Sequence, residues 1–297
     1  MSPESAFYRI GITSVVLPNT LLFIGDYAFS NADSGDISVT YRGTENTFTE
    51  IIIPDSVTQI GAGAFQIGRL LGLGMSIQSQ LVKVSIGSGV QTIGTEAFAN
   101  NNLTEIALPD SLVTIGNGAF QSNQLQKVLL GRRIQTIGAS AFSGNNLTEI
   151  ELPSSLVTIE QWAFSDNLLQ SVILPNSLKN IGEGAFSNNQ IQSIALPNGI
   201  AVSSNIFIGN PLNTLVIPAS LNIQIDLRFW LGPFWGGPRP TVFSELPLTQ
   251  ITMPANMSDL DLEHTGFETS FVNFYTNQRK VAGTYVRNGP IWTLSGN

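Results

Sequence analysis

The chain contains no cysteine among its 297 residues, which excludes disulfides, thiolate nucleophiles and cysteine metal ligands. Charge is also scarce. Charged residues make up 11% of the sequence, well below the roughly 25% of ordinary soluble domains, so Asn, Ser, Thr and Gln must supply most of the polar surface. Acidic residues outnumber basic ones by 21 to 13. Because nucleic-acid binding proteins usually carry a basic face, we expect no nucleic-acid partner.

Long hydrophobic runs are missing as well. No stretch of the sequence approaches the roughly 18 consecutive apolar residues of a membrane-spanning helix. The first ten residues, MSPESAFYRI, carry neither the basic segment nor the apolar core of a secretion signal. We therefore expect either a cytoplasmic protein or a secreted or surface protein whose signal is not part of this sequence.

Patterns for catalysis and metal binding are equally sparse. The single histidine, His264, has no serine in a nucleophile-elbow motif to activate, and we interpret it as a surface residue. Asp259, Asp261 and Glu263 alternate and would share one face of an extended segment, where three carboxylates could hold Ca²⁺. They match no calcium-loop pattern, which favours a solvated acidic face. We predict no catalytic residue, no metal site and no cofactor, and hence no enzyme.

An internal repeat dominates the sequence. Its unit reads L-x-x-I-x-L-P-x-S-L-x-x-I-G-x-x-A-F-x-x-N-x, and its most regular copies follow one another at 22 residues. The first position of the unit is occupied by Ile12, Phe48, Leu81, Leu103, Leu125, Leu147, Leu169, Ile191, Leu212 and Leu248. Ten copies of one supersecondary unit predict a solenoid, in which each coil buries its apolar side against its neighbours.

Three columns of the repeat have a direct physical interpretation. Leu, Ile and Phe recur in register and would form internal rows. Pro closes most strand segments because it cannot donate to a sheet ladder. Asn recurs at a turn, where its side chain can bond backbone groups that lack a ladder partner. The Asn column comprises Asn101, Asn123, Asn145, Asn167, Asn189 and Asn210.

The fold class predicted from these columns is a β-rich leucine-rich-repeat solenoid over residues 1–255, with about ten coils. We expect a continuous parallel sheet on one face, with one strand for each L-x-x-I-x-L segment. The repeat is lost after residue 255, and alternating apolar residues then surround Asn288-Gly289, a strong signal for a β-hairpin. Residues 256–297 are therefore predicted to form a small C-terminal β-hairpin cap.

The repeat resembles the BspA-type (treponemal-type) leucine-rich repeats of bacteria. The resemblance is carried by L-P-x-S-L segments such as residues 108–112, and by I-G-x-x-A-F segments such as residues 115–120. It covers roughly residues 6–255. Proteins of this family are typically exported or attached to the cell surface and are linked to adhesion and to host or matrix contact. The family contributes no catalytic residues to carry over to this chain.

Two rows of side chains should point outward from the strand segments, at the third and fifth positions of each copy. The third-position row alternates in charge over Glu50, Lys83, Glu105, Lys127 and Glu149, which supports the register between coils. The fifth-position row is mostly apolar and includes Val16, Ile52, Leu129, Ile173 and Val216. An exposed apolar row is typical of an interaction surface; the alternative is that β-branched residues simply favour strands.

Insertions interrupt the repeat in three places. Residues 30–47 and 66–80 leave adjacent coils at the same edge and could form a raised wall for a partner, or could instead cap the N-terminal end of the core. Their candidate contact residues are Tyr41, Arg42, Leu71 and Met75.

The third insertion contains the aromatic segment Phe229–Trp235. Trp230, Phe234 and Trp235 could stack on sugar rings or could form a hydrophobic plug under a long loop. The sequence as a whole predicts a non-enzymatic module for protein-protein interaction or adhesion at the bacterial cell surface. The expected partner is a protein ligand such as a host or matrix protein. Carbohydrate binding through the aromatic insertion is the alternative.

Overall fold

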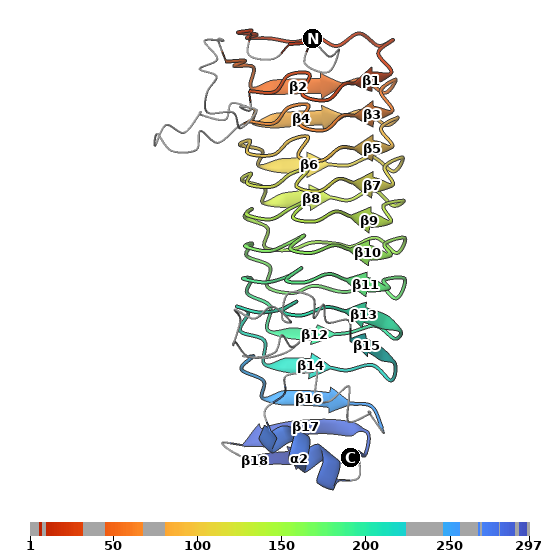
Figure 1. Cartoon of the computed structure of the whole chain (residues 1–297), viewed down its shortest axis with the longest axis vertical. Coiled ribbons are helices and arrows are strands. Elements are labelled where there is room, and N and C mark those ends of the chain that lie inside the picture. Colours follow the sequence, from red (N-terminus) through yellow and green to blue (C-terminus); the bar gives the residue numbers. More distant parts are fainter. Residues whose placement is uncertain are drawn as a thin grey trace, which may run out of the picture. The chain divides into compact units, whose positions relative to one another are not determined.

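The computed structural model describes residues 6–7, 10–31, 45–67, 81–223, 246–255, 267, 269–278, 280–288 and 291–295. By its internal contacts the chain divides into two compact units, Met1–Leu156 and Val157–Asn297, and each is described by itself. In both units a short repeat forms one coil with two straight sides, and equivalent sides of successive coils lie next to one another (Figure 1).

The described part of the first unit contains two rows of parallel strands. One row follows the T-I segments in the order β1-β3-β5-β7-β9, and the other follows the L-x-x-I-x-L segments, with β2 paired to β4 and β6 paired to β8. The first row comprises β1 (Phe23–Ile24), β3 (Gln59–Ile60), β5 (Thr92–Ile93), β7 (Thr114–Ile115) and β9 (Thr136–Ile137). The second row comprises β2 (Glu50–Ile53), β4 (Lys83–Ile86), β6 (Glu105–Ala107) and β8 (Lys127–Leu129).

The second unit repeats this arrangement and adds a cap. Its T-I row runs β10-β11-β13-β15, and its L-x-x-I-x-L row runs β12-β14-β16 before β17 and β18 join antiparallel. The T-I row comprises β10 (Thr158–Ile159), β11 (Asn180–Ile181), β13 (Ile200–Val202) and β15 (Leu221–Ile223). The other strands are β12 (Ser193–Ala195), β14 (Thr214–Val216), β16 (Gln250–Met253), β17 (Gly283–Asn288) and β18 (Ile291–Leu294).

Glycine explains why the T-I row is the more continuous of the two. The residue after the T-I pair is Gly in most coils, and it faces the backbone of the preceding coil. A Cβ added at Gly94 would lie 2.6 Å from the amide nitrogen of Ala62, and one added at Gly116 would lie 2.5 Å from the carbonyl carbon of Gly94. At these positions no side chain separates the backbones of neighbouring coils.

The repeat therefore folds as the predicted solenoid, but the strands are distributed differently than expected. The expectation of one strand in every L-x-x-I-x-L segment is wrong, because the segments that begin at Ile12, Leu147 and Leu169 form no β-strand. Their inward side chains stay in the core nonetheless, as the full burial of Leu147 and Leu169 shows. The apolar pattern fixes which side chains point inward, whereas the spacing between backbones decides where a ladder forms.

The core is built around the Phe column. Within the first unit, Phe65, Phe98, Phe120 and Phe142 stack at centroid distances of 5.2 to 5.4 Å with nearly parallel rings. All but Phe65 of these side chains are fully buried, and Phe65 is 3% exposed. Parallel stacking of equivalent rings follows directly from the repeat, because each coil places its Phe one coil spacing from the next.

The Asn column ties successive coils together. Asn123 donates from Nδ2 to the carbonyl of Phe98 in the preceding coil at 2.9 Å, and its Oδ1 accepts from the amide of Leu103 at 3.1 Å. Asn145 in the first unit and Asn189 in the second make the same two bonds. Each donates to the carbonyl of the Phe in the preceding coil and accepts from the amide of a Leu. The buried side chain thus satisfies backbone groups at a turn where no ladder reaches them, as the sequence predicted.

The C-terminal cap contains the predicted hairpin and an additional helix. Strand β17 pairs antiparallel with both β16 and β18, and Asn288 is the last residue of β17, opposite Ile291. The two residues between them lie outside the described part of the chain. Helix α2 (Thr269–Asn277) was not predicted; it buries Phe271 and Tyr275 against Tyr285 and Trp292. The division into residues 1–255 and 256–297 stays a prediction.

Candidate interaction surface

The fifth-position row is exposed in both units. In strand β2 the side chains alternate between solvent and core, and Ile52 lies on the solvent side with 71% of its surface exposed. Val16 is 94% exposed and Leu129 is 55% exposed in the first unit, and Ile173 is 86% exposed in the second. Val216 is half-buried. The row therefore presents apolar side chains to solvent, as alternation along the strand predicted.

In the first unit the fifth-position row combines large apolar side chains with small ones. Ile52 lies opposite Ser85 in the β2–β4 pair, and Ala107 lies opposite Leu129 in the β6–β8 pair. Strands β4 and β6 are in contact. Two large apolar side chains thus flank two small ones, and neighbouring strands lie about 4.8 Å apart. We define this set of four positions, with small side chains between two large ones, by Ile52, Ser85, Ala107 and Leu129. We refer to it as the fifth-position trough.

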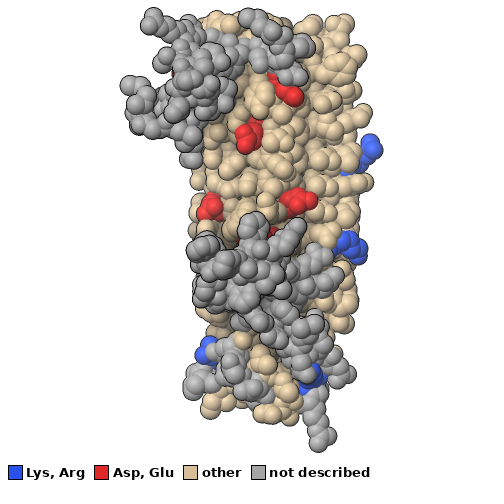
Figure 2. Space-filling view, in the orientation of Figure 1, with Lys and Arg blue, Asp and Glu red and all other residues tan. Residues whose placement is uncertain are grey.

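The third-position row runs beside this trough and alternates in charge. Glu50 lies opposite Lys83, and Glu105 lies opposite Lys127, so the register that the alternation predicted is confirmed for these two pairs. Opposite charges on neighbouring strands cancel and leave the surface near the trough without a dominant sign. On the face of the molecule that Figure 2 presents, the few acidic and basic side chains stand among uncharged residues, in keeping with the low charge content of the sequence.

Several residues that the sequence singled out lie outside the described part of the chain. These are the insertion residues Tyr41, Arg42, Leu71 and Met75, the aromatic residues Trp230, Phe234 and Trp235, and the acidic segment with Asp259, Asp261, Glu263 and His264. The roles suggested for them stay predictions. Within the described residues, His, Asp and Glu nowhere form a group of three or more that could hold a metal ion.

The described residues likewise include no helix that is long and apolar enough to cross a membrane.

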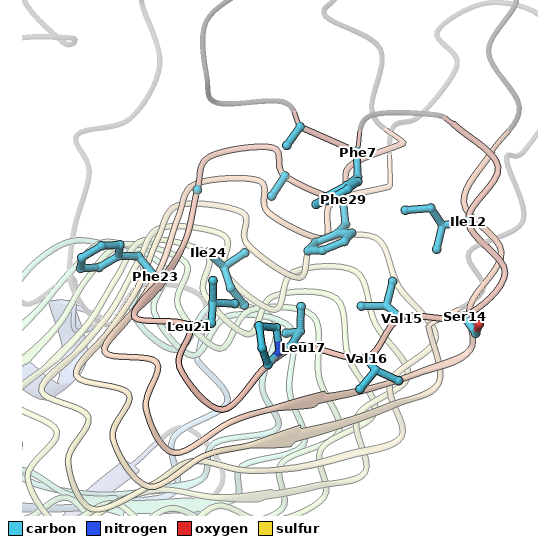
Figure 3. A pocket seen from close by; sticks show the side chains of 14 residues that line it. Phe7, Ile12, Ser14, Val15, Val16, Leu17, Leu21, Phe23, Ile24 and Phe29 are labelled. Carbon is cyan, nitrogen blue, oxygen red and sulfur yellow. The ribbon is translucent and has the colours of Figure 1, made fainter.

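A second apolar surface was not singled out from the sequence. At the N-terminal end of the first unit, a hollow of about 560 Å³ opens between the two sides of the first coil and is lined almost entirely by apolar residues. Figure 3 shows Phe7 over Phe29 at its upper side, with Val15, Leu17 and Leu21 around its lower part. We call this the N-terminal hollow. The equivalents of Val15, Leu17 and Leu21 in the next coil, which are Ile51, Ile53 and Val57, are buried in the core.

Comparison with known proteins agrees with the fold. A family model described as the BspA type leucine rich repeat region matches six copies, over residues 2–42, 39–167 and 113–228. No curated protein sequence matches the chain. A solved leucine-rich repeat protein from Bacteroides ovatus is 26% identical, with a TM-score of 0.47 over 64% of this chain. The alignment covers 58% of the length of that protein.

Two further solved structures are similar at lower identity. The pneumococcal vaccine antigen PcpA is 20% identical over 75% of this chain and 80% of its own, with a TM-score of 0.33. A leucine rich cell surface protein from Faecalibacterium prausnitzii is 20% identical over 75% of this chain and 64% of its own, with a TM-score of 0.37. Since the family model spans most of the sequence, the chain belongs to the BspA-type leucine-rich repeat family.

Proposed function

We propose that this chain is a non-enzymatic binding module that contacts a protein ligand through the fifth-position trough, at the surface of a bacterial cell. Family membership supports a module of the protein-interaction type. The surface location is supported by the family, whose members are typically secreted or attached to the cell surface. Residues 1–255 would provide the binding array, and residues 256–297 would close its C-terminal end.

The exposure of the row's large side chains carries the proposal. Ile52 and Leu129 present 71% and 55% of their surface to solvent, although the side chains next to them in their strands, Ile51, Ile53 and Val128, are packed in the core. Clustered exposed aliphatic residues mark interaction sites more often than isolated ones do. The small side chains of Ser85 and Ala107 between them leave space for an inserted side chain, and such pockets commonly hold the residues that dominate binding energy.

The charges near the trough favour a protein ligand over a polyanion. Glu50 lies opposite Lys83 and Glu105 lies opposite Lys127, so the formal charges of these four residues sum to zero. A polyanion would require a surplus of basic residues, whereas a protein ligand needs an apolar centre with a mixed polar rim. The trough with its neighbouring third-position row has this composition.

Surface plasmon resonance on the immobilised full chain tests the proposal, with purified collagen, fibronectin and laminin as protein probes. The double variant Ile52→Lys/Leu129→Lys should weaken binding of a responding probe by at least about tenfold, as expected for residues that dominate an interface. Ile173→Lys is the matched control, because Ile173 is equally apolar and more exposed but lies in the second unit.

Three outcomes contradict the proposal: no response to any protein probe, equal affinity of the double variant and the original chain, or an equal loss in the Ile173→Lys control. An unchanged melting temperature of each variant ensures that a loss of binding reports on the surface. Cellohexaose and chitohexaose serve as glycan probes in a parallel arm, with Trp230→Ala and Trp235→Ala as variants. Glycan binding that these two variants abolish would favour the carbohydrate alternative.

A further inference from the structure

One turn in the second unit departs from the repeat. Residues 160–162 read E-Q-W, where the preceding coils read G-D-Y, G-A-G, G-T-E, G-N-G and G-A-S and the next coil reads G-E-G. Glycine suits the first of these positions because it lies against a neighbouring backbone: a Cβ added at Gly182 would lie 2.4 Å from the amide nitrogen of Gln161. Glu160 therefore replaces a glycine that the packing of the coils favours.

The third position of this turn holds its residue in a left-handed backbone conformation. The φ values at this position lie between 53° and 61° in Tyr27, Gly63, Glu96, Gly118, Ser140, Trp162, Gly184 and Asn205. Bulky residues rarely adopt this conformation, yet Trp162 has the largest side chain of the set and is still 37% exposed. Residues that stand against the local preference of the backbone are concentrated at functional sites.

The ring of Trp162 is held in place by the next coil. A Cβ added at Gly184 would lie 2.3 Å from both Cε3 and Cζ3 of the ring, so the ring occupies the space that a side chain at position 184 would fill. The amide of Trp162 also donates to the carbonyl of Glu183 at 2.8 Å. An exposed aromatic side chain that is already held in one position loses little conformational freedom when a ligand stacks on it.

Polar side chains flank this ring. Glu160 and Gln161 come directly before it and are exposed, and Glu183 of the next coil is half-buried. Four residues after the ring, Asp166 accepts at Oδ1 from Nδ2 of Asn188 at 2.8 Å on the surface. We call residues 160–166 together with residues 183–188 the Trp162 corner. It contains carboxylates and amides but no lysine, arginine or histidine.

The chemistry of the Trp162 corner fits a neutral glycan. One face of a pyranose ring presents C–H groups, which pack against the negative face of an aromatic ring. The hydroxyls at its edge can donate to carboxylates and can exchange hydrogen bonds with amides. A sulfated or carboxylated glycan would instead require basic side chains, which the corner lacks.

We propose that the Trp162 corner binds a neutral glycan, with the indole ring stacked on a pyranose and with Glu160 and Asp166 accepting hydrogen bonds from its hydroxyls. This site is separate from the fifth-position trough, which belongs to the first unit. The two proposals therefore stand or fall independently.

Isothermal titration calorimetry on the full chain tests the site, with cellohexaose, laminarihexaose, mannohexaose and chitohexaose as probes. At least one probe should bind, and Trp162→Ala should weaken its binding by at least about tenfold through loss of the stacked ring. Trp162→Phe keeps an aromatic ring and should retain most of the affinity. Tyr27→Ala is the matched control, because Tyr27 holds the same position of its coil and is 45% exposed but lies in the first unit.

Glu160→Gly is a second variant that restores the residue of the other coils, so the fold should tolerate it. It removes one acceptor and should weaken binding of the responding probe by about fivefold. Failure of all four glycans to bind, equal affinity of Trp162→Ala and the original chain, or an equal loss in Tyr27→Ala would overturn the proposal. A loss confined to Trp230→Ala and Trp235→Ala would place the glycan in the aromatic insertion and would also overturn it.

Discussion

Asn145 donates from Nδ2 to the carbonyl of Phe120 at 3.0 Å, and thereby links one coil to the coil before it. The same nitrogen also bonds the carbonyl of Phe142, while Oδ1 accepts from the amide of Leu125 at 3.0 Å. One buried side chain satisfies backbone groups from two coils. The Asn column therefore satisfies buried backbone groups between the coils, and the Phe column fills the apolar core.

Asn145→Ala should lower the free energy of unfolding by at least about 2 kcal/mol, since it leaves several buried backbone groups without a partner and each costs roughly 1–3 kcal/mol. The measurement is urea denaturation followed by circular dichroism. Asn146→Ala is the matched control: its side chain bonds Gln124 on the surface at 3.0 Å, so its loss should cost under about 0.5 kcal/mol. Similar losses in both variants would show that the buried network does not stabilise the coil.

The repeat columns made most of this architecture predictable. Burial of the Asn column, and of the Phe column from Phe29 to Phe207, followed from their register, because equivalent positions of stacked coils share one environment. Phe7 at the start of the column is 42% exposed and departs from this expectation. It was harder to predict which side of the coil would carry the more continuous row of strands. The L-x-x-I-x-L pattern is the stronger strand signal, but the backbone contact at Gly94 and its equivalents appears only when two coils are stacked.

Trp162 offers a second test of coil stacking. It adopts a positive φ of 58°, a conformation that bulky residues rarely adopt, and lies over Gly184 of the next coil, which also has a φ of 58°. A Cβ added at Gly184 would lie 2.3 Å from Cε3 of the Trp162 ring. Gly184→Ala should therefore destabilise the protein by about 2–4 kcal/mol, through backbone strain and the clash together.

A double-mutant cycle separates these two contributions. Trp162→Ala in the Gly184→Ala background should recover part of the loss, because it removes the clash but not the strain. Gly199→Ala is the control for strain alone, since Gly199 has a φ of 70° and its added Cβ would meet only Ser220 Oγ at 4.0 Å. Strictly additive effects of Trp162→Ala and Gly184→Ala would show that the two residues do not interact.

The candidate surfaces were predictable to different degrees. Alternation along the strand correctly predicted that Ile52 and Leu129 face solvent, because a period of two fixes the face of each residue. It could not show that Ser85 and Ala107 lie between these two residues, since that depends on which strands are neighbours. The N-terminal hollow escaped prediction because most of its residues follow the pattern of the core.

Truncation of the Phe column should be costly. Phe120 is fully buried and stacks on Phe98 and Phe142 at 5.3 and 5.4 Å. Phe120→Ala should lower the free energy of unfolding by about 3–5 kcal/mol, the usual range for buried Phe truncations, as measured by chemical denaturation. Phe23→Ala is the control, because Phe23 points to solvent and is 61% exposed. A loss below about 1 kcal/mol for Phe120→Ala would mean that the column is not core.

The way in which the stability of the protein changes at low pH should depend on Asp55. The backbone amide of Ser88 in the next coil donates to Oδ1 of Asp55 at 2.6 Å, and the Ser88 hydroxyl adds a second bond at 3.0 Å. These bonds, the backbone bond first, hold the pKa of the carboxyl below its ordinary value of 3.8. A carboxyl with a lowered pKa in the folded state contributes stability above its unfolded pKa, and this stability is lost as the pH falls through the folded pKa.

We therefore expect the stability difference between the original chain and Asp55→Ala to stay constant from neutral pH down to about pH 5 and to shrink below about pH 4. Urea denaturation at a series of pH values measures it. Ser88→Ala removes the hydroxyl but keeps the backbone amide, so most of the pH dependence should remain in that variant. A difference that is independent of pH, or one that grows in acid, would show that the Asp55 carboxylate is not stabilised by the neighbouring coil.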